Sequence, residues 1–398
     1  MGIVRKKISG GIFAPKGFRG VALSCGIKDG KPTRLDVALV AADKLCSAAG
    51  TFTTNKVKAA PVKVSMERVA SGRARAILLN SGNANACSGP EGITAAKAST
   101  AVAAKLLGCA TEDVLVCSTG RIGVALPLER IEKGLSAIKE LSRSAGEDCA
   151  RAIMTSDTYH KQASCEITTP EGKFRIGAMA KGAGMIDPTM ATMLCVFTTD
   201  ARIAPSILQK TLREVVKETF NCISVDGDMS TNDTVLALAS GESGIAPGAA
   251  ILKEAMVGIL GEMARMIVLD GEGVSRLVEV RVNGAASPAD AKRAAEAVAN
   301  STLTKCAWFG GDPNWGRILC ALGYSGAKLA EEKISLDYNG LPAVRCGVLA
   351  PQADWKKIKA VVAKKQFRVE ISLGLGSHSY EAWTTDLTPE YVDFNKGE

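Results

Sequence analysis

A single threonine, Thr192, stands between a loop-like segment and a strand-like one. Residues 181–188 contain two Gly and one Pro, which is typical of irregular backbone. Residues 193–199 are apolar and β-branched, as in a buried strand. At such a strand entrance the Thr192 hydroxyl could attack the Ala191 carbonyl, and hydrolysis of the ester would leave a free amine to activate the same hydroxyl. The alternative is a solvated turn that leads into a core strand.

The sequence contains few residues for a catalytic site based on histidine, paired cysteines or a metal ion. The chain has only two histidines, His160 and His378, which leaves little for a Ser-His-Asp or Cys-His catalyst and disfavours a metal site built on His. Its twelve cysteines are scattered singly with no C-x-x-C pair, which argues against zinc and against a thioredoxin-type dithiol. We therefore expect no metal.

The composition indicates a compact protein of a reducing compartment. With 398 residues and 46% hydrophobic content the chain can bury a sizeable core, and its length suggests two or three domains. No run of 18 apolar residues occurs, and the first residues lack the apolar segment of a secretion signal. Twelve cysteines favour a cytoplasmic protein. The charge of +8 is dispersed and aromatic residues are only 5%, so we expect no nucleic-acid partner, whereas anionic small molecules suit such a surface.

Strand-like and helix-like segments alternate along the chain, which predicts a mixed α/β fold. Apolar runs with period two or none predict strands, and apolar positions at helical spacing predict helices. The predicted strands are 74–79, 114–117, 173–180, 193–199 and 278–282, and the predicted helices are 93–107, 246–266, 288–300 and one that begins at Pro205. We expect the strands on either side of Thr192 to be adjacent.

Several polar clusters that contain glycine interrupt these elements, and most of them allow two interpretations. Residues 118–123 are either a simple turn or an oxyanion site, because a Gly lets backbone approach a ligand and a Thr hydroxyl adds a donor. Residues 225–234 lack the EF-hand ligand spacing, which favours a hydrogen-bonded turn. Residues 270–273 form a surface turn or a ligand for an ammonium group. Residues 311–317 are a loop with a partly buried Trp and an Arg that could hold a carboxylate.

Taken together and in this order, the motifs resemble the ornithine acetyltransferase family, also called the arginine-biosynthesis glutamate N-acetyltransferases. The resemblance covers essentially the whole chain. It is carried by Ala14–Arg19, Thr51–Asn55, Asn80–Gly89, Ser118–Gly123, Thr155–Thr158, Lys181–Leu194, Asp226–Thr234, Asp270–Gly273, Gly311–Arg317 and Asp386–Thr388. A series of long motifs is highly specific, and it favours a functional interpretation of each cluster over a structural one.

The resemblance implies a self-cleaving acetyltransferase of arginine biosynthesis. The precursor would cut itself between Ala191 and Thr192 into two chains that stay together, which we expect to form a heterotetramer of two of each. Thr192 would then accept the acetyl group of N2-acetylornithine, ornithine would leave, and glutamate would take the acetyl group. No cofactor is implied, and acetyl-CoA as a further donor is left open.

The family pattern also assigns residues. It places Thr119 and Gly120 in an oxyanion hole, where their donors would stabilise the charge that develops on the attacked carbonyl. The positions that match its substrate contacts are Thr158, Lys181, Thr192, Glu272 and Asn395. As a hypothesis, Lys181 pairs with the substrate α-carboxylate and Glu272 with the ornithine side-chain ammonium.

The family resemblance implies a layered α/β fold, an αββα-type sandwich with sheets between helices, plus a smaller C-terminal α/β domain. We expect residues 1–275 to form the catalytic body and residues 276–398 the C-terminal domain. The sequence departs from the family pattern at Arg121, where an apolar residue is common, and at Asp187, where His is common. Family members also continue past Asn395 to a Tyr, a variable residue and a substrate-contacting Thr or Ser, whereas this sequence ends at Glu398.

Two other functions remain open at this point. An N-terminal-nucleophile amidase or aminopeptidase on a related fold would use water in place of glutamate as acceptor, and would release acetate or cleave peptides. A non-catalytic binding protein would keep an intact chain and would show salt-sensitive affinity for nucleic acid. Formation of N-acetylglutamate from acetylornithine and glutamate separates acetyl transfer from both.

Overall fold

The computed structural model describes residues 3–187 and 193–396, which divide into two compact units. The described part of the first unit is 3–182, 193–221 and 229–267, and that of the second is 183–187, 222–228 and 268–396. The chain therefore passes between the units more than once. The predicted domain boundary between residues 275 and 276 falls inside the second unit, and the domain assignment stays a prediction.

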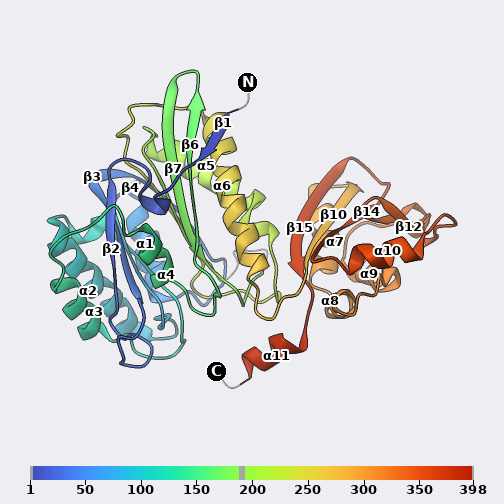
Figure 1. The fold of residues 1–398 in the computed structure, drawn as a ribbon, viewed down its shortest axis with the longest axis horizontal. Coiled ribbons are helices and arrows are strands. Elements are labelled where there is room, and N and C mark those ends of the chain that lie inside the picture. The colour runs from blue at the N-terminus through green and yellow to red at the C-terminus, as the bar shows by residue number, and fades with distance from the viewer. Residues whose placement is uncertain (1–2, 188–192, 397–398) are drawn as a thin grey trace. The chain divides into compact units, whose positions relative to one another are not determined.

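The first unit holds one sheet and most of the helices (Figure 1). Its strands are β1 (Val4–Lys7), β2 (Phe18–Leu23), β3 (Val37–Phe52), β4 (Arg73–Asn80), β5 (Val114–Ser118), β6 (Lys161–Thr169), β7 (Gly172–Lys181), β8 (Leu194–Thr199) and β9 (Thr234–Ala239). Its helices are α1 (Ala60–Val69), α2 (Gly89–Leu107), α3 (Leu128–Ser136), α4 (Gly146–Ala152), α5 (Pro205–Glu218) and α6 (Ala249–Leu269), of which the last two residues of α6 belong to the second unit.

The sheet of the first unit is continuous but folds into two halves at β3. The strand order is β1-β6-β7-β8-β9-β3-β4-β5, with β2 paired to β3. The first part of β3 pairs with β2 and β4, its last part pairs with β9, and the pairing register with β4 shifts between Ala41 and Cys46. Such an irregularity bends a strand and increases its twist. One long strand therefore belongs to both halves.

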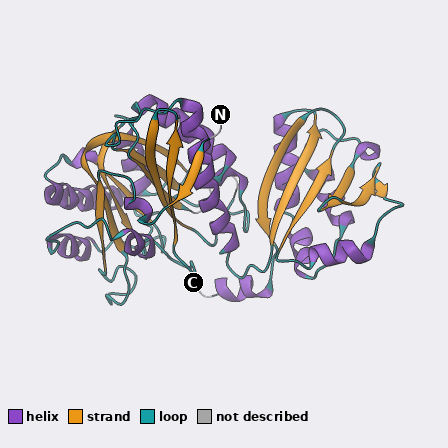
Figure 2. Cartoon of the chain, turned by 45° about the horizontal axis from the view of Figure 1, so that its top comes forward, coloured by secondary structure: helices purple, strands orange, loops and turns teal. Residues whose placement is uncertain are grey.

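The two halves of the sheet pack face to face over a shared apolar core. Ile77 and Leu115 from one half and Val196 and Leu236 from the other belong to the same buried cluster. Helices α2 and α3 cover the outer face of the β2–β5 half, and α5 is tied to β3 through Gln209. Figures 1 and 2 show α5 and α6 beside the strands of the other half. The predicted αββα sandwich is confirmed, with the two sheet layers joined through β3.

Strands β7 and β8 position the segment that the sequence singles out. They pair antiparallel, with Lys181 opposite Leu194, so the residues that precede and follow 182–193 meet at one end of the hairpin. Strand β8 also pairs in parallel with β9, where Leu194 lies opposite Thr234. The expected adjacency of the strands around Thr192 is confirmed, although residues 188–192 lie outside the described residues.

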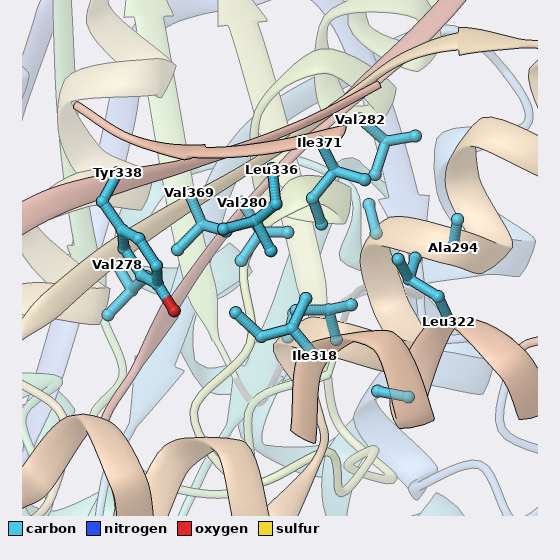
Figure 3. Close-up of a cluster of buried hydrophobic side chains, with 14 of the residues drawn as sticks. Val278, Val280, Val282, Ala294, Ile318, Leu322, Leu336, Tyr338, Val369 and Ile371 are labelled. Carbon is cyan, nitrogen blue, oxygen red and sulfur yellow. The ribbon is translucent and has the colours of Figure 1, made fainter. Parts of the chain in front are cut away.

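The second unit has its own sheet and its own core. Its strands, in the order β13-β12-β11-β14-β10-β15, are β10 (Leu277–Ala285), β11 (Ser335–Tyr338), β12 (Leu341–Arg345), β13 (Val348–Leu349), β14 (Gln366–Ser372) and β15 (His378–Thr385). Its helices are α7 (Pro288–Ala299), α8 (Thr302–Phe309), α9 (Trp315–Tyr324), α10 (Trp355–Val362) and α11 (Pro389–Asn395). Figure 3 shows Val280, Leu336 and Val369 of this sheet facing Ile318 of α9 and Ala294 of α7. The expected smaller α/β domain is present.

Candidate active site

Parallel strands β4 and β5 end side by side and present polar groups at their carboxyl ends. Asn80 pairs with Ser118 at the last register position, and the Ser118 hydroxyl donates to Asn80 Oδ1 at 2.7 Å. The Asn232 side-chain amide donates to the carbonyls of Ala84 at 2.7 Å and Ser118 at 2.8 Å. These bonds fix the backbone immediately before Thr119. The 225–234 segment is thus the hydrogen-bonded turn that its sequence favours.

Gly120 occupies a position that excludes every other residue. Its φ of 128° lies in the region that favours glycine. A Cβ atom there would lie 2.4 Å from the carbonyl carbon of Gly82 and 2.6 Å from the nitrogen of Asn83. The neighbouring Thr119 is buried, and its amide donates to the Asn80 carbonyl at 3.0 Å. The Thr119–Gly120 pair is therefore held rigidly at the end of β5.

Lys181, the last residue of β7, is brought to Thr119. Its side chain is buried, and Nζ lies 3.3 Å from Thr119 Oγ1 and 2.6 Å from Thr155 Oγ1. An ammonium group can only donate, so both hydroxyl oxygens accept from it. The Thr119 hydroxyl proton therefore remains available to another acceptor.

Asp157 lies next to this lysine and is fully buried. Its Oδ1 accepts from Lys161 Nζ at 2.6 Å and from the Gly182 amide at 2.7 Å, and Oδ2 accepts from the Thr155 amide at 3.0 Å. Burial alone would raise the pKa of Asp157, but the Lys181 and Lys161 charges and these hydrogen bonds hold that pKa below its usual value. The carboxyl group is ionised at neutral pH.

The proposed nucleophile and cleavage position, Thr192 and Ala191, lie outside the described residues, but the residue that follows them is described. The Met193 amide donates to Asp233 Oδ1 at 3.2 Å, and the Met193 carbonyl accepts from the Thr234 amide at 3.1 Å. Asp233 is buried, which raises its pKa well above the usual value despite the nearby Lys181 charge. Its Oδ2 has no hydrogen-bond partner among the described residues.

Glu272 and Asn395, two of the predicted substrate contacts, meet in the second unit. Asn395 Nδ2 donates to Glu272 Oε2 at 3.0 Å. The Glu272 amide donates to the Ala183 carbonyl at 3.0 Å, and its carboxylate lies over Gly184, where a Cβ atom would lie 2.4 Å from it. A side chain at 184 would therefore push this carboxylate out of its present position.

Asp226 holds the same loop in the second unit. Its carboxylate accepts from the amides of Met185 at 2.6 Å and Ile186 at 2.8 Å, and from the Tyr391 hydroxyl at 3.2 Å. Met185 has a φ of 59°, which is uncommon for a residue with a side chain. The carboxylate therefore stabilises a strained turn. Burial raises the pKa of Asp226 above its usual value.

The remaining predicted residues have less defined settings. Thr158 is exposed beside the buried Asp157. Arg121 donates to the Lys28 carbonyl at 3.4 Å. In the 311–317 motif, Trp315 is half-buried at the start of α9, and Arg317 donates to the Leu303 carbonyl at 2.7 Å. This contact of Arg317 with the backbone is structural.

The structure also brings in residues that sequence reasoning did not assign. Thr155, Asp157, Lys161 and Asp233 surround Lys181 or Met193. A signal was present for two of them, because Asp157 and Lys161 are spaced four residues apart with opposite charge just before an apolar strand. Unless both residues are known to be buried, that spacing predicts an ordinary ion pair on the surface.

Comparisons with known proteins agree with the motif pattern. The family model for the ArgJ family matches residues 19–397. The chain is 46% identical over 387 residues to the arginine biosynthesis bifunctional protein ArgJ of Geobacter sulfurreducens, covering 96% of this chain and 98% of the relative. It is 44% identical over 396 residues to the protein of that name from Symbiobacterium thermophilum, covering 98% of each.

Two solved structures are also similar. The crystal structure of arginine biosynthesis bifunctional protein ArgJ from Bacillus halodurans is 35% identical, with a TM-score of 0.48, and the match covers 50% of this chain and 97% of that chain. The ornithine acetyltransferase from Mycobacterium tuberculosis, complexed with ornithine, is 33% identical, with a TM-score of 0.42, covering 48% of this chain and all of that chain. Among the described residues, no helix has the length and apolar content needed to cross a membrane.

Proposed function

We propose a mechanism from one premise, which is that this chain belongs to the ArgJ family. It is an acetyl-transferring enzyme of arginine biosynthesis. The observation that supports the proposed site most directly is the contact of Lys181 Nζ with Thr119 Oγ1 at 3.3 Å, because it joins two motifs 62 residues apart in the sequence. The substrates are small molecules. We propose that N2-acetylornithine is the donor and glutamate the acceptor.

We propose that the chain first cuts itself. The Thr192 hydroxyl attacks the Ala191 carbonyl, the C–N bond breaks, and the hydroxyl proton passes to the released nitrogen. Water then hydrolyses the ester, which leaves Thr192 as a free N-terminus. Its amine has an unperturbed pKa of roughly 8 and can take the proton of the adjacent hydroxyl. One residue thereby supplies both nucleophile and base.

Acetyl transfer then follows in two steps. The Thr192 hydroxyl attacks the acetyl carbonyl of N2-acetylornithine, its proton goes to the departing amine, and ornithine leaves. The glutamate amine attacks the resulting acetyl ester and gives N-acetylglutamate and free Thr192. Because both substrates use one nucleophile, initial rates should follow a ping-pong pattern.

The oxyanion of each step is assigned to Thr119 and Gly120. Thr119 Oγ1 accepts from Lys181, so its own proton can be directed at a developing negative charge. The Lys181 charge lies one hydrogen bond behind that hydroxyl and makes it a stronger donor. Gly120 provides the backbone amide, and its position excludes a side chain that would shield the amide.

Charged side chains are assigned to the charged ends of the substrates. We assign Lys181 to a substrate carboxylate and Glu272 to the ornithine side-chain ammonium. Asn395 donates to Glu272, which orients the carboxylate. Thr158 is assigned as a further contact. The reaction as written uses no metal or organic cofactor.

Three finer statements belong to the same proposal. The name "bifunctional" of the relatives supports acetyl-CoA as a second acetyl donor. The two chains that follow from cleavage are proposed to form a heterotetramer of two of each. We place the enzyme in the cytoplasm, where reduced cysteines persist.

Mass spectrometry and an acetyl-transfer assay test this proposal together. The purified protein should give fragments of 191 and 207 residues (398 − 191 = 207), and Thr192→Ala should remain one chain. Wild-type protein mixed with N2-acetylornithine and glutamate should form N-acetylglutamate, and replacing the donor by acetyl-CoA tests the second activity. Intact wild-type protein that is fully active would refute the self-cleavage mechanism, and release of acetate alone would indicate a hydrolase.

Two substitutions separate charge stabilisation from binding. Thr119→Ala should lower kcat by about 10²–10³ with little change in KM, as loss of one oxyanion donor does. Thr198→Ala is the matched control, since Thr198 is a buried threonine of β8 whose hydroxyl donates to the Ile12 carbonyl at 2.6 Å. Lys181→Ala should raise KM through the lost substrate contact and should also lower kcat, because the charge behind the Thr119 hydroxyl is removed. A Thr119→Ala enzyme with raised KM and unchanged kcat would move the oxyanion role elsewhere.

A further inference from the structure

The carboxylate of Asp157 contacts both sides of Lys181. On one side it accepts from the amide of Gly182, the residue that follows Lys181, at 2.7 Å. On the other side it accepts at 3.0 Å from the amide of Thr155, whose hydroxyl accepts from Lys181 Nζ at 2.6 Å. One buried carboxylate therefore fixes both the backbone and the hydroxyl partner of this lysine.

Two buried lysines interact with the Asp157 carboxylate. Lys161 and Lys181 are both buried, and Asp157 is the carboxylate that accepts directly from Lys161 at 2.6 Å. The Lys181 charge lowers the pKa of both Asp157 and Asp233, but burial raises the pKa of Asp233 above its usual value. Burial penalises an ammonium group that lacks a counter-charge, which then releases its proton at lower pH. Asp157 is thus an ionised carboxylate that interacts with both lysines.

We propose that Asp157 is a positioning residue for acetyl transfer, which holds the charged Lys181 ammonium against Thr119 Oγ1 through the Gly182 and Thr155 amides. This inference rests on the proposed function, because Thr119 matters only if its hydroxyl serves the reaction. Lys161 is part of the same device, since it shares the carboxylate and is buried with it. Nothing in the proposed reaction requires Asp157 or Lys161 to contact substrate.

Loss of the charge at Asp157 should change the pH profile of the enzyme. In Asp157→Asn the amide oxygen can still accept from Gly182, but the negative charge next to the Lys161 and Lys181 ammonium groups is lost. We expect kcat for N2-acetylornithine and glutamate to fall by about 10²-fold, the loss that a small misplacement of a catalytic group causes. The remaining activity should decline further as the pH rises, because an unneutralised buried ammonium gives up its proton.

Adding Lys161→Met to Asp157→Asn tests whether activity can be restored. The double variant Asp157→Asn/Lys161→Met removes one of the two lysine charges that lie next to the lost carboxylate, so we expect it to be more active and less sensitive to high pH than Asp157→Asn. If Asp157→Asn alone does not fold, the test compares Lys161→Met with the double variant. There the added Asp157→Asn change should still lower kcat and introduce the decline at high pH.

Asp200→Asn is the matched control. Asp200 is a buried aspartate at the far end of β8 and accepts from the backbone amides of Lys16 at 3.0 Å and Arg175 at 2.7 Å, without a lysine side chain on its carboxylate. Its kcat and pH profile should match those of wild type.

The outcomes separate this inference from the proposed function. Wild-type protein that forms no N-acetylglutamate would refute the proposed function. An active wild type with an Asp157→Asn variant of equal kcat and equal pH profile would overturn the positioning role alone. A double variant whose kcat equals that of Lys161→Met would do the same.

Discussion

The charge of one lysine, Lys181, acts on two buried aspartates whose pKa values are shifted in opposite directions. Asp157, just before β6, has two lysine charges nearby and accepts three hydrogen bonds, two from backbone amides, and its pKa is lowered. Asp233, just before β9, accepts from the Met193 amide, and its pKa is raised. Depth of burial does not distinguish them. Met193, Thr53 and Ser230 all hydrogen-bond to Asp233, so the number of donors does not distinguish them either, and the Lys161 ammonium, 2.6 Å from Asp157, is the group that Asp233 lacks.

This difference separates two tasks within the first unit. An ionised Asp157 can neutralise Lys161 and keep Lys181 charged, which the proposed oxyanion site requires. A neutral Asp233 can accept from the Met193 amide through one oxygen without adding negative charge beside the proposed nucleophile. We therefore expect the two residues to differ in stability, in pH dependence and in tolerance of an amide.

The largest difference should appear when each side chain is truncated. Asp157→Ala leaves two buried ammonium groups without their shared carboxylate, and breaking a buried pair in this way costs about 3–5 kcal/mol of unfolding free energy. Asp233→Ala removes the acceptor of the Met193 amide, and a buried amide left without a partner costs about 1–3 kcal/mol, while the Thr53 hydroxyl, which also bonds to Asp233, keeps the Ser230 carbonyl as an acceptor at 2.8 Å. Urea unfolding of both variants measures the gap. Equal losses would show that the charge on Asp157 contributes nothing beyond its hydrogen bonds.

A second difference lies in acid. The lowered pKa of Asp157 stabilises the folded state above the unfolded pKa of about 3.9, and this stability is lost as the pH falls through the lower folded value. Asp157→Asn/Lys161→Met removes the titrating pair, so its stability should change less between pH 5 and pH 3 than that of wild type. Thermal melts across this range measure it, and an unchanged slope would contradict the assignment.

The contribution of Asp233 to stability should have the opposite dependence on pH. Its raised folded pKa contributes stability that is fully present below about pH 4 and is lost as the pH rises through the folded value. Asp233→Asn cannot ionise, so the variant should gain stability relative to wild type as the pH rises. The same melts extended to pH 9 test this, and a relative loss at high pH would show that Asp233 is ionised in the folded protein.

The smallest effect is expected for Asp233→Asn at low pH. Asparagine presents a carbonyl oxygen and a donor, as a neutral carboxyl group does, and can accept from Met193 in the same place. We expect a change within about 1 kcal/mol at pH 4, the size of one neutral hydrogen bond. Asp200→Asn serves as the reference for a buried aspartate on backbone amides. A loss of several kcal/mol would mean that Asp233 is not neutral even there.

The elements that carry the site could be predicted from the sequence, because their signals are local. Alternation over 173–180 and the apolar run at 193–199 predicted β7 and β8, and Pro205 marked the start of α5. The cluster around Lys181 could not be predicted in full. Its members come from three segments, and only the fold shows that Asp157 and Lys161 are buried beside Lys181. Strand β3 is not among the predicted strands, and its bend leaves no signal in the composition because it is a shift of pairing register.

The place of the proposed cut in the sheet has a consequence for how the two products relate. Cleavage between Ala191 and Thr192 would leave β7 on one chain and the next two strands of the sheet, β8 and β9, on the other, with β3 of the first chain beyond β9. The second chain therefore fills a gap between two groups of strands that belong to the first. Taken alone, the first chain would have two unpaired strand edges, at β7 and β3, and such edges tend to pair with other molecules. The sheet must form before the bond is cut, and the mature enzyme inherits a topology that its separated chains do not encode.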